Sequence, residues 1–180
     1  MVTRQDFMKC CALGVCSAFL PEPAIASATD DAGDLQWKLD ASRVRYAKFI
    51  QIVKSGTDDV GYKRLLHSLG RECAMQHRSR TFDKYKGNIK GFLAAIQGPS
   101  GWVAEAQYDE AKGTIRIVDR ASTCTCPLVE QGVTPADQCD CTLGWQEETY
   151  SRILERPVKA ELEESILRGG KRCVFRIRAV

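Results

Sequence analysis

The sequence predicts an α+β domain in which about four antiparallel strands form two hairpins and helices pack on one face of the sheet. Apolar residues recur at three- and four-residue spacings through the first half of the chain, which predicts amphipathic helices. Later they alternate in two segments that each contain a glycine turn, which predicts the hairpins. With 180 residues, 44% of them hydrophobic, the chain has enough material for one core of ordinary size.

Residues 1–28 have the pattern of a peptide that directs export. Arg4 and Lys9 lie in a short polar start, the apolar stretch Cys10–Leu20 follows, and small residues end the segment. The start resembles a twin-arginine signal, with Gln5 where the second arginine belongs. We therefore expect an export machinery to deliver the protein to the periplasm or the cell exterior as one mature domain over 29–180. An ordinary secretory signal and a buried N-terminal helix are the alternatives.

The sequence of the first half of the mature domain predicts three helices. The first covers residues 35–56, the second follows a cap at 57–59 and extends to His77, and the third spans Phe82–Gln97. Gly70 lies inside the second helix, where glycine is unfavourable by about 1 kcal/mol relative to alanine. We therefore expect a close packing contact at that position.

The second half predicts a hairpin, a cysteine-rich loop, a helix and a second hairpin. Turn residues separate the two strands of each hairpin, and a proline ends the helix. In chain order the elements are expected at 102–108, 114–119, Ser122–Cys141, Leu143–Glu155, 158–163 and 173–178.

Cysteine is the most informative residue type. Three of the nine cysteines, Cys10, Cys11 and Cys16, leave with the export peptide. Of the remaining six, four form two C-x-C pairs at the ends of the loop, and Cys73 lies one helical turn before His77. Zinc and iron in clusters prefer sulfur ligands in a tetrahedral arrangement. The sequence therefore predicts a zinc or iron-sulfur site, with ligands from Cys73, Cys124, Cys126, Cys139 and Cys141.

Each of these residues also has a simpler interpretation. In an exported protein six cysteines are permitted three disulfides, and cross-pair bridges between the ends of the loop are then expected. Cys73 and Cys173 lie on apolar stripes, where a cysteine packs as a small hydrophobic residue. His77 fits an exposed surface histidine, and thiol-disulfide exchange by the C-x-C pairs is a further possibility.

Composition and motifs exclude several other classes. The net charge of +3 is small and its basic residues are interspersed, so no nucleic-acid partner is expected. The chain contains no apolar run of membrane-spanning length, and hence no stable anchor is expected. The fingerprints of serine hydrolases, phosphate loops and dinucleotide folds are missing, so the sequence identifies no catalytic residues.

Several short motifs together resemble one family, the L-2-amino-thiazoline-4-carboxylic acid hydrolase-like proteins. The resemblance covers residues 35–180. Its final element is also similar to the 4-vinyl reductase type of small-ligand domain. The motifs are Gly70-Arg71-Glu72-Cys73-Ala74, Cys124-x-Cys126-Pro127, Cys139-x-Cys141 with Gly144-Trp145, Pro157-Val158, and Glu164-Ser165-Ile166 with Gly169 leading to Cys173-x-Phe175-x-Ile177.

The resemblance implies an α+β domain that binds a small molecule. For hydrolase members it also implies hydrolysis of a cyclic C–N bond that opens a thiazoline ring. A metal ion held by the loop cysteines would activate water only if one coordination position stayed open. Two functions are therefore carried forward: an exported hydrolase-like protein with a cysteine-lined metal site, and a non-enzymatic binding or sensing module with structural cysteines.

Overall fold

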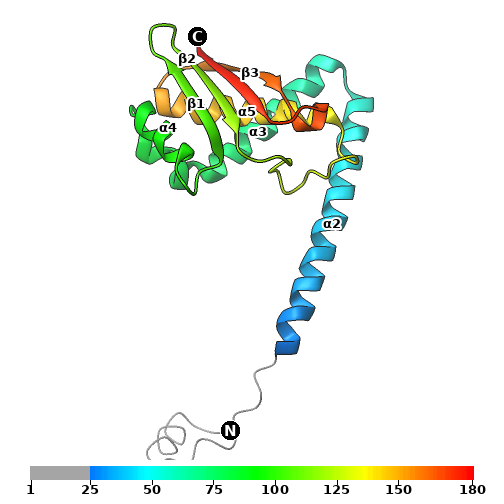
Figure 1. The fold of residues 1–180 in the computed structure, drawn as a ribbon. Coiled ribbons are helices and arrows are strands. Elements are labelled where there is room, and N and C mark those ends of the chain that lie inside the picture. Colours follow the sequence, from blue (N-terminus) through cyan, green and yellow to red (C-terminus); the bar gives the residue numbers. More distant parts are fainter. Residues whose placement is uncertain (1–24) are drawn as a thin grey trace, which may run out of the picture. The chain divides into compact units, whose positions relative to one another are not determined.

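The described chain places three helices before the first strands and one between the two hairpins (Figure 1). The structure is a computed structural model that describes the backbone of residues 25–180 and the side chains of 32–76 and 82–180. Most of the predicted export segment lies outside these residues. By its contacts the chain divides into two units, Met1–Asp40 and Ala41–Val180. Among the described helices, none has the length and apolar character that crossing a membrane requires.

The turn between the first two helices lies where the sequence predicts it. Helix α2 spans Ile25–Gly56, so it begins ten residues before the expected start and ends where expected. Helix α3 spans Asp59–Thr81. Asp58 caps it, because its Oδ1 accepts a hydrogen bond of 2.7 Å from the backbone N–H of Gly61. The predicted cap is therefore confirmed.

The prediction of one continuous helix over Phe82–Gln97 is wrong. A 3₁₀ turn at Asp83–Tyr85 precedes helix α4, Ile89–Gln97. Gly87 adopts a positive φ of 69°, which no α-helix interior allows. Asn88 then starts α4, since its side chain accepts a 2.9 Å hydrogen bond from the backbone of Gly91.

The fourth predicted helix begins earlier than expected. Helix α5 spans Cys139–Leu154 rather than starting at Leu143. A 3₁₀ turn at Ala136–Gln138 leads directly into it and supplies the geometry that starts the helix. The second C-x-C pair therefore lies on the first turn of a helix and not in the loop.

The sheet confirms the predicted antiparallel arrangement. The strands are β1 (Val103–Asp109), β2 (Thr114–Asp119), β3 (Val158–Glu164) and β4 (Val174–Ala179), and their order in the sheet is β1-β2-β4-β3. Both predicted hairpins form, and β2 pairs with β4 to join them.

One face of this sheet carries the core and the other carries charge. Ile115, Ile117 and Ile177 are buried in the main core together with residues of α4 and α5. The alternate residues on the same strands are charged: Arg116 and Arg176 bind Glu163 through hydrogen bonds of 2.8 and 2.6 Å. The prediction that helices pack on one face of the sheet is therefore confirmed.

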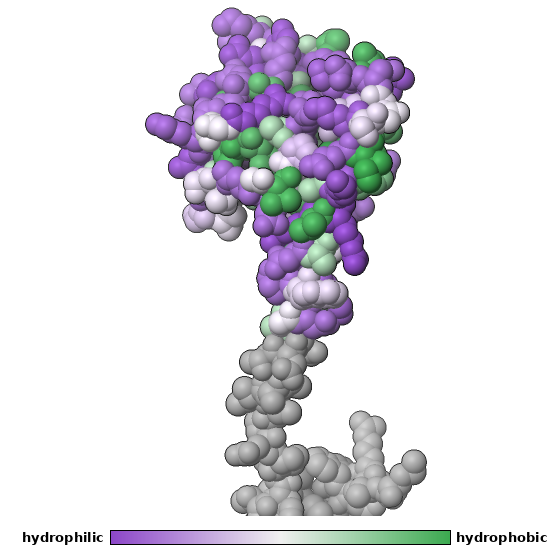
Figure 2. All heavy atoms as spheres, turned by 90° about the vertical axis from the view of Figure 1, so that its right-hand side faces the viewer, coloured by the Kyte–Doolittle hydropathy of each residue, from purple (hydrophilic) through white to green (hydrophobic). Residues whose placement is uncertain are grey.

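Some apolar side chains of α2 and α3 lie on the surface. Phe49, Ile52, Val60 and Leu65 are each more than half exposed. The face in Figure 2 shows apolar groups separated by hydrophilic residues rather than one continuous apolar area. Scattered apolar residues are normal on soluble domains and do not by themselves mark a site.

Candidate functional site

Two glycines bring the backbones of α3 and α5 into contact. A Cβ on Gly70 would lie 1.8 Å from the carbonyl oxygen of Cys141, and a Cβ on Gly144 would lie 2.0 Å from that of His67. Only glycine fits at either position without moving a helix. The close packing predicted at Gly70 is confirmed, and it places one side of α3 directly above the buried side chains of α5.

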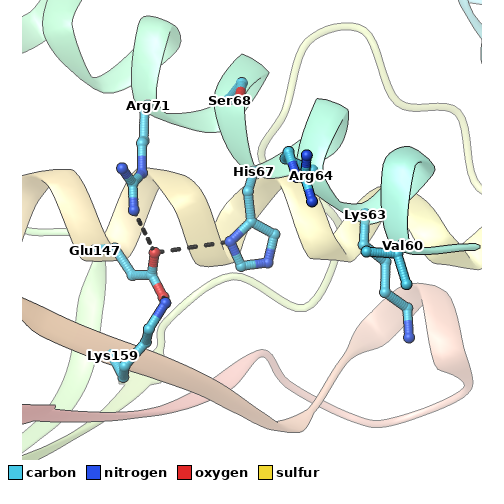
Figure 3. A pocket seen from close by; sticks show the side chains of 8 residues that line it. All are labelled: Val60, Lys63, Arg64, His67, Ser68, Arg71, Glu147 and Lys159. Carbon is cyan, nitrogen blue, oxygen red and sulfur yellow. Dashed lines mark hydrogen bonds and ion pairs between the residues drawn. The ribbon is translucent and has the colours of Figure 1, made fainter.

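Glu147 of α5 is the centre of the polar groups at this contact. Its side chain is 3% exposed, and its Oε2 accepts a 2.9 Å hydrogen bond from Arg71 of α3. His67 Nδ1 lies 3.7 Å from the same oxygen, and Lys159 Nζ of β3 lies 3.5 Å from Oε1. The backbone N–H of Ala160 also donates to Oε1, at 3.4 Å. Three elements therefore meet at one carboxylate (Figure 3).

These partners keep Glu147 ionised. Burial alone would raise its pKa, but the polar contact with His67, the hydrogen bonds from Arg71 and Ala160 and the charge of Lys159 lower it to about 2. The carboxylate is thus charged throughout the physiological range.

A groove of about 360 Å³ opens beside Glu147 (Figure 3). Its walls come from α3, α5 and β3, and we call it the α3–α5 groove. A second cavity of about 230 Å³ shares Arg71 and Glu147 with it. The groove is lined by Val60, Lys63, Arg64, His67, Ser68, Arg71, Glu147 and Lys159.

Three of the predicted metal ligands lie near one another. Cys73 is on α3, Cys126 in the loop and Cys141 on α5. Burial and the neighbouring thiols of Cys126 and Cys73 raise the pKa of Cys141 to about 12, while burial and the thiol of Cys126 raise the pKa of Cys73. Nearby, Arg43 Nε donates a 2.8 Å hydrogen bond to the carbonyl of Pro127, which ties the loop beside Cys126 to α2.

The other two predicted ligands, Cys124 and Cys139, lie beside Cys173. Their charges raise the pKa of Cys173, although burial is the larger cause. Cys139 Sγ shares a 2.8 Å hydrogen bond with Ser165 Oγ. Burial also raises the pKa of Asp119, next to this group, to about 6. The two sets of thiols are also neighbours of each other, because Cys126 raises the pKa of Cys124 and Cys139 raises that of Cys141.

The six thiols in the described part of the chain are free. Within residues 32–76 and 82–180 no three His, Cys, Asp or Glu side chains are grouped so that they could hold a metal ion. Thiol sulfur is a ligand type that zinc and iron prefer. The zinc or iron-sulfur site stays a prediction. His77 lies in α3, outside the residues with described side chains.

The groove residues were not among the predicted site residues. Of the two glycines that fix the helix contact, the sequence predicts a packing role for Gly70 only, and Gly144 enters only as part of the resemblance motif. Glu147 follows Gly144 by three residues on α5, so a charged residue on an inward stripe was the available signal. Its partners on α3 and β3 could not be read from spacing, because they meet it only in the folded chain.

Comparisons with known proteins show similarity of fold. No family model and no curated protein matches the chain. A trafficking protein particle complex subunit 3 from Naegleria fowleri, solved covalently bound to palmitic acid, is 15% identical with a TM-score of 0.50, and the match covers 78% of this chain and 96% of that one. The phenol-responsive sensory domain of the transcription activator PoxR, solved with phenol, is 15% identical with a TM-score of 0.39, covering 74% and 73%. The first similarity places the chain with small α+β domains of this architecture.

Proposed function

We propose that the chain is a small-ligand-binding module whose ligand occupies the α3–α5 groove. The observation that carries this proposal is the convergence of polar side chains from three elements on Glu147, at the wall of a concave surface. Ligand sites are concave and hold a few polar groups fixed by packed elements, and their volumes start at about 300 Å³. A solved domain of similar fold carries bound palmitic acid, which supports ligand binding by this architecture.

Binding is favoured over hydrolysis by the state of Glu147. A carboxylate with a pKa of about 2 is a weak proton acceptor at neutral pH. Ring-opening hydrolysis, with or without a metal, therefore stays a prediction of the family resemblance. Turnover of 2-amino-thiazoline-4-carboxylate tests it, with Glu147→Gln as the comparison.

The proposal is tested by screening a fragment library that contains anionic, neutral and cationic members by ligand-observed NMR. The groove is then filled by Ser68→Trp, because Ser68 lines it and is exposed. We expect fragments that bind the wild-type chain to lose binding to this variant.

The matched control is Gln76→Trp, at an exposed position of the same helix that does not line the groove. It is expected to keep all fragment binding. The proposal is overturned if no fragment of any charge binds, or if Ser68→Trp and Gln76→Trp bind the same fragments equally well.

A further inference from the structure

The α3–α5 groove holds more positive than negative charge. Lys63, Arg64 and Arg71 of α3 and Lys159 of β3 line it with permanent positive charges, and Glu147 is the one carboxylate among its lining residues. His67 adds a further charge whenever it is protonated. A net positive concave surface attracts anions and concentrates them.

Two of these cations have no counter-charge among the side chains that the structure describes. Neither Lys63 nor Arg64 makes a hydrogen bond or an ion pair with any of the described side chains, and both are exposed. Some exposed basic residues elsewhere are paired, such as Lys90 with Glu110 at 2.8 Å, whereas Lys86 and Lys171 are exposed and make no side-chain ion pair with the described residues. The charge of Lys63 and Arg64 is therefore available to a ligand.

Glu147 holds Arg71 and Lys159 in place but leaves some of their N–H donors unpaired. Its two oxygens are occupied by the four groups described above, so it is held in one position. Arg71 contacts it through one terminal nitrogen only and stays half exposed, and the side chain of Lys159 is 65% exposed. Because a guanidinium carries five N–H donors, Arg71 keeps donors for a second, incoming acid group.

We infer that the α3–α5 groove binds a small organic anion, a carboxylate or a phosphate monoester, through Lys63, Arg64, Arg71 and Lys159. This inference rests on the proposed ligand-binding function and names the chemical class of its ligand. Glu147 is a positioning residue in this site: it orients Arg71 and Lys159 across the groove and does not itself bind the anion.

A solvated basic helix face is the simpler interpretation, and two observations argue against it. The basic side chains of α3 line a groove instead of a convex surface, and Lys159 faces them from another element (Figure 3). The buried carboxylate of Glu147 also holds Arg71 and Lys159 in place, which lowers the entropic cost of ordering these two side chains when a ligand binds.

Isothermal titration calorimetry of the full chain with thiophene-2-carboxylate and thiophene-2-carboxamide tests the inference. The two probes share a ring and differ in charge. We expect the acid to bind at least about ten-fold more tightly than the amide, a difference that one or two charge-assisted hydrogen bonds supply. Inorganic phosphate is the second probe: competition with the acid assigns the site to both anion types, and lack of competition assigns it to carboxylates.

Variants locate the site. Lys63→Gln with Arg64→Gln is expected to weaken binding of the acid about ten-fold and to leave amide binding unchanged. The matched control, Lys86→Gln with Lys171→Gln, removes two exposed positive charges elsewhere and is expected to change affinity less than about two-fold. All four positions are exposed, and thermal melting of each variant verifies that it folds.

Two results overturn the inference. If acid and amide bind equally in the groove, a ligand site exists but charge does not select its ligand, and the proposed function stands alone. If the control variant weakens the acid as much as Lys63→Gln with Arg64→Gln, the attraction is a property of the net charge and not of the groove. Failure of every fragment in the preceding screen would instead remove the proposed function itself.

Discussion

Glu147 joins three elements through one carboxylate. Arg71 and His67 approach it from α3 and Lys159 from β3, at 2.9 to 3.7 Å. Without its charge the cations Arg71 and Lys159 would face one another unbalanced at the edge of the core, which is unfavourable. The residue that shapes the groove is thus also a stabilising residue.

Glu147→Gln is expected to lower the free energy of unfolding by about 2 kcal/mol, because it replaces charge-assisted hydrogen bonds at a buried position. Chemical denaturation at neutral pH measures the change. Glu161→Gln is the control, since Glu161 pairs with Arg178 on the exposed sheet face and its loss should cost less than about 0.5 kcal/mol. Equal effects of the two substitutions would contradict a special role for Glu147.

The stability of the protein should also depend on the ionisation of Glu147. Its pKa is about 2 in the folded chain against an ordinary value of 4.5. Folding therefore favours the ionised form, and this contribution is complete above pH 4.5 and is lost as the pH falls towards 2. Denaturation at a series of acidic pH values should show a steeper loss for the wild type than for Glu147→Gln. Parallel curves would refute the assignment.

At the scale of elements, the contact between α3 and α5 decides where the groove lies. Gly70 and Gly144 let the two backbones touch, and each position rejects a Cβ because a carbonyl oxygen of the other helix lies within about 2 Å of it. The groove residues His67 and Arg71 are carried on the same turns of α3.

Gly144→Ala is expected to destabilise the fold by about 2 kcal/mol, since the two helices must move apart to admit the methyl group. Gly33→Ala provides the comparison: a Cβ there meets nothing within 4 Å, so alanine should not destabilise α2. Thermal melting of both variants measures the difference. A Gly144→Ala variant as stable as Gly33→Ala would show that the helices are not in backbone contact.

The sequence allowed both hairpins, the cap of α3 and the packing role of Gly70 to be predicted, because each depends on local spacing or on one residue type. It did not allow the break before α4 to be predicted, since the apolar spacing continues across Gly87 and Asn88, whose backbone conformation interrupts the helix. The start of α5 at Cys139 was missed for a related reason: the loop cysteines carry no helical pattern of their own. The groove depends on contacts between α3, α5 and β3, which spacing alone cannot provide.

At the scale of the molecule, the small net charge conceals an uneven distribution. On the exposed sheet face Arg116, Arg176 and Arg178 are balanced by Glu161 and Glu163. The α3–α5 groove is lined by four cations and one carboxylate, and only Arg71 and Lys159 pair with that carboxylate. A net charge of +3 therefore argues against a nucleic-acid surface but is compatible with one local anion site.

The neighbours of each thiol predict how the described cysteines would pair on oxidation. Treatment with oxidised glutathione should join Cys73 to Cys126 or Cys141, and Cys173 to Cys124 or Cys139. Each bridge forms as thiolate attack displaces reduced glutathione, and peptide mapping by mass spectrometry identifies it. A bridge between Cys73 and Cys173, neither of which raises the pKa of the other, would contradict this arrangement. Metal analysis of anaerobically purified protein tests the separate zinc or iron-sulfur prediction.

The central claim is that the α3–α5 groove is where this protein binds its ligand. The most direct measurement is a ¹⁵N–¹H correlation spectrum of the full chain titrated with thiophene-2-carboxylate. Binding in the groove predicts that the largest shifts fall on the amides of Ser68, Arg71 and Lys159, with little change in the loop between β2 and α5. Shifts concentrated in that cysteine-rich loop, or spread evenly over the surface, would contradict the claim.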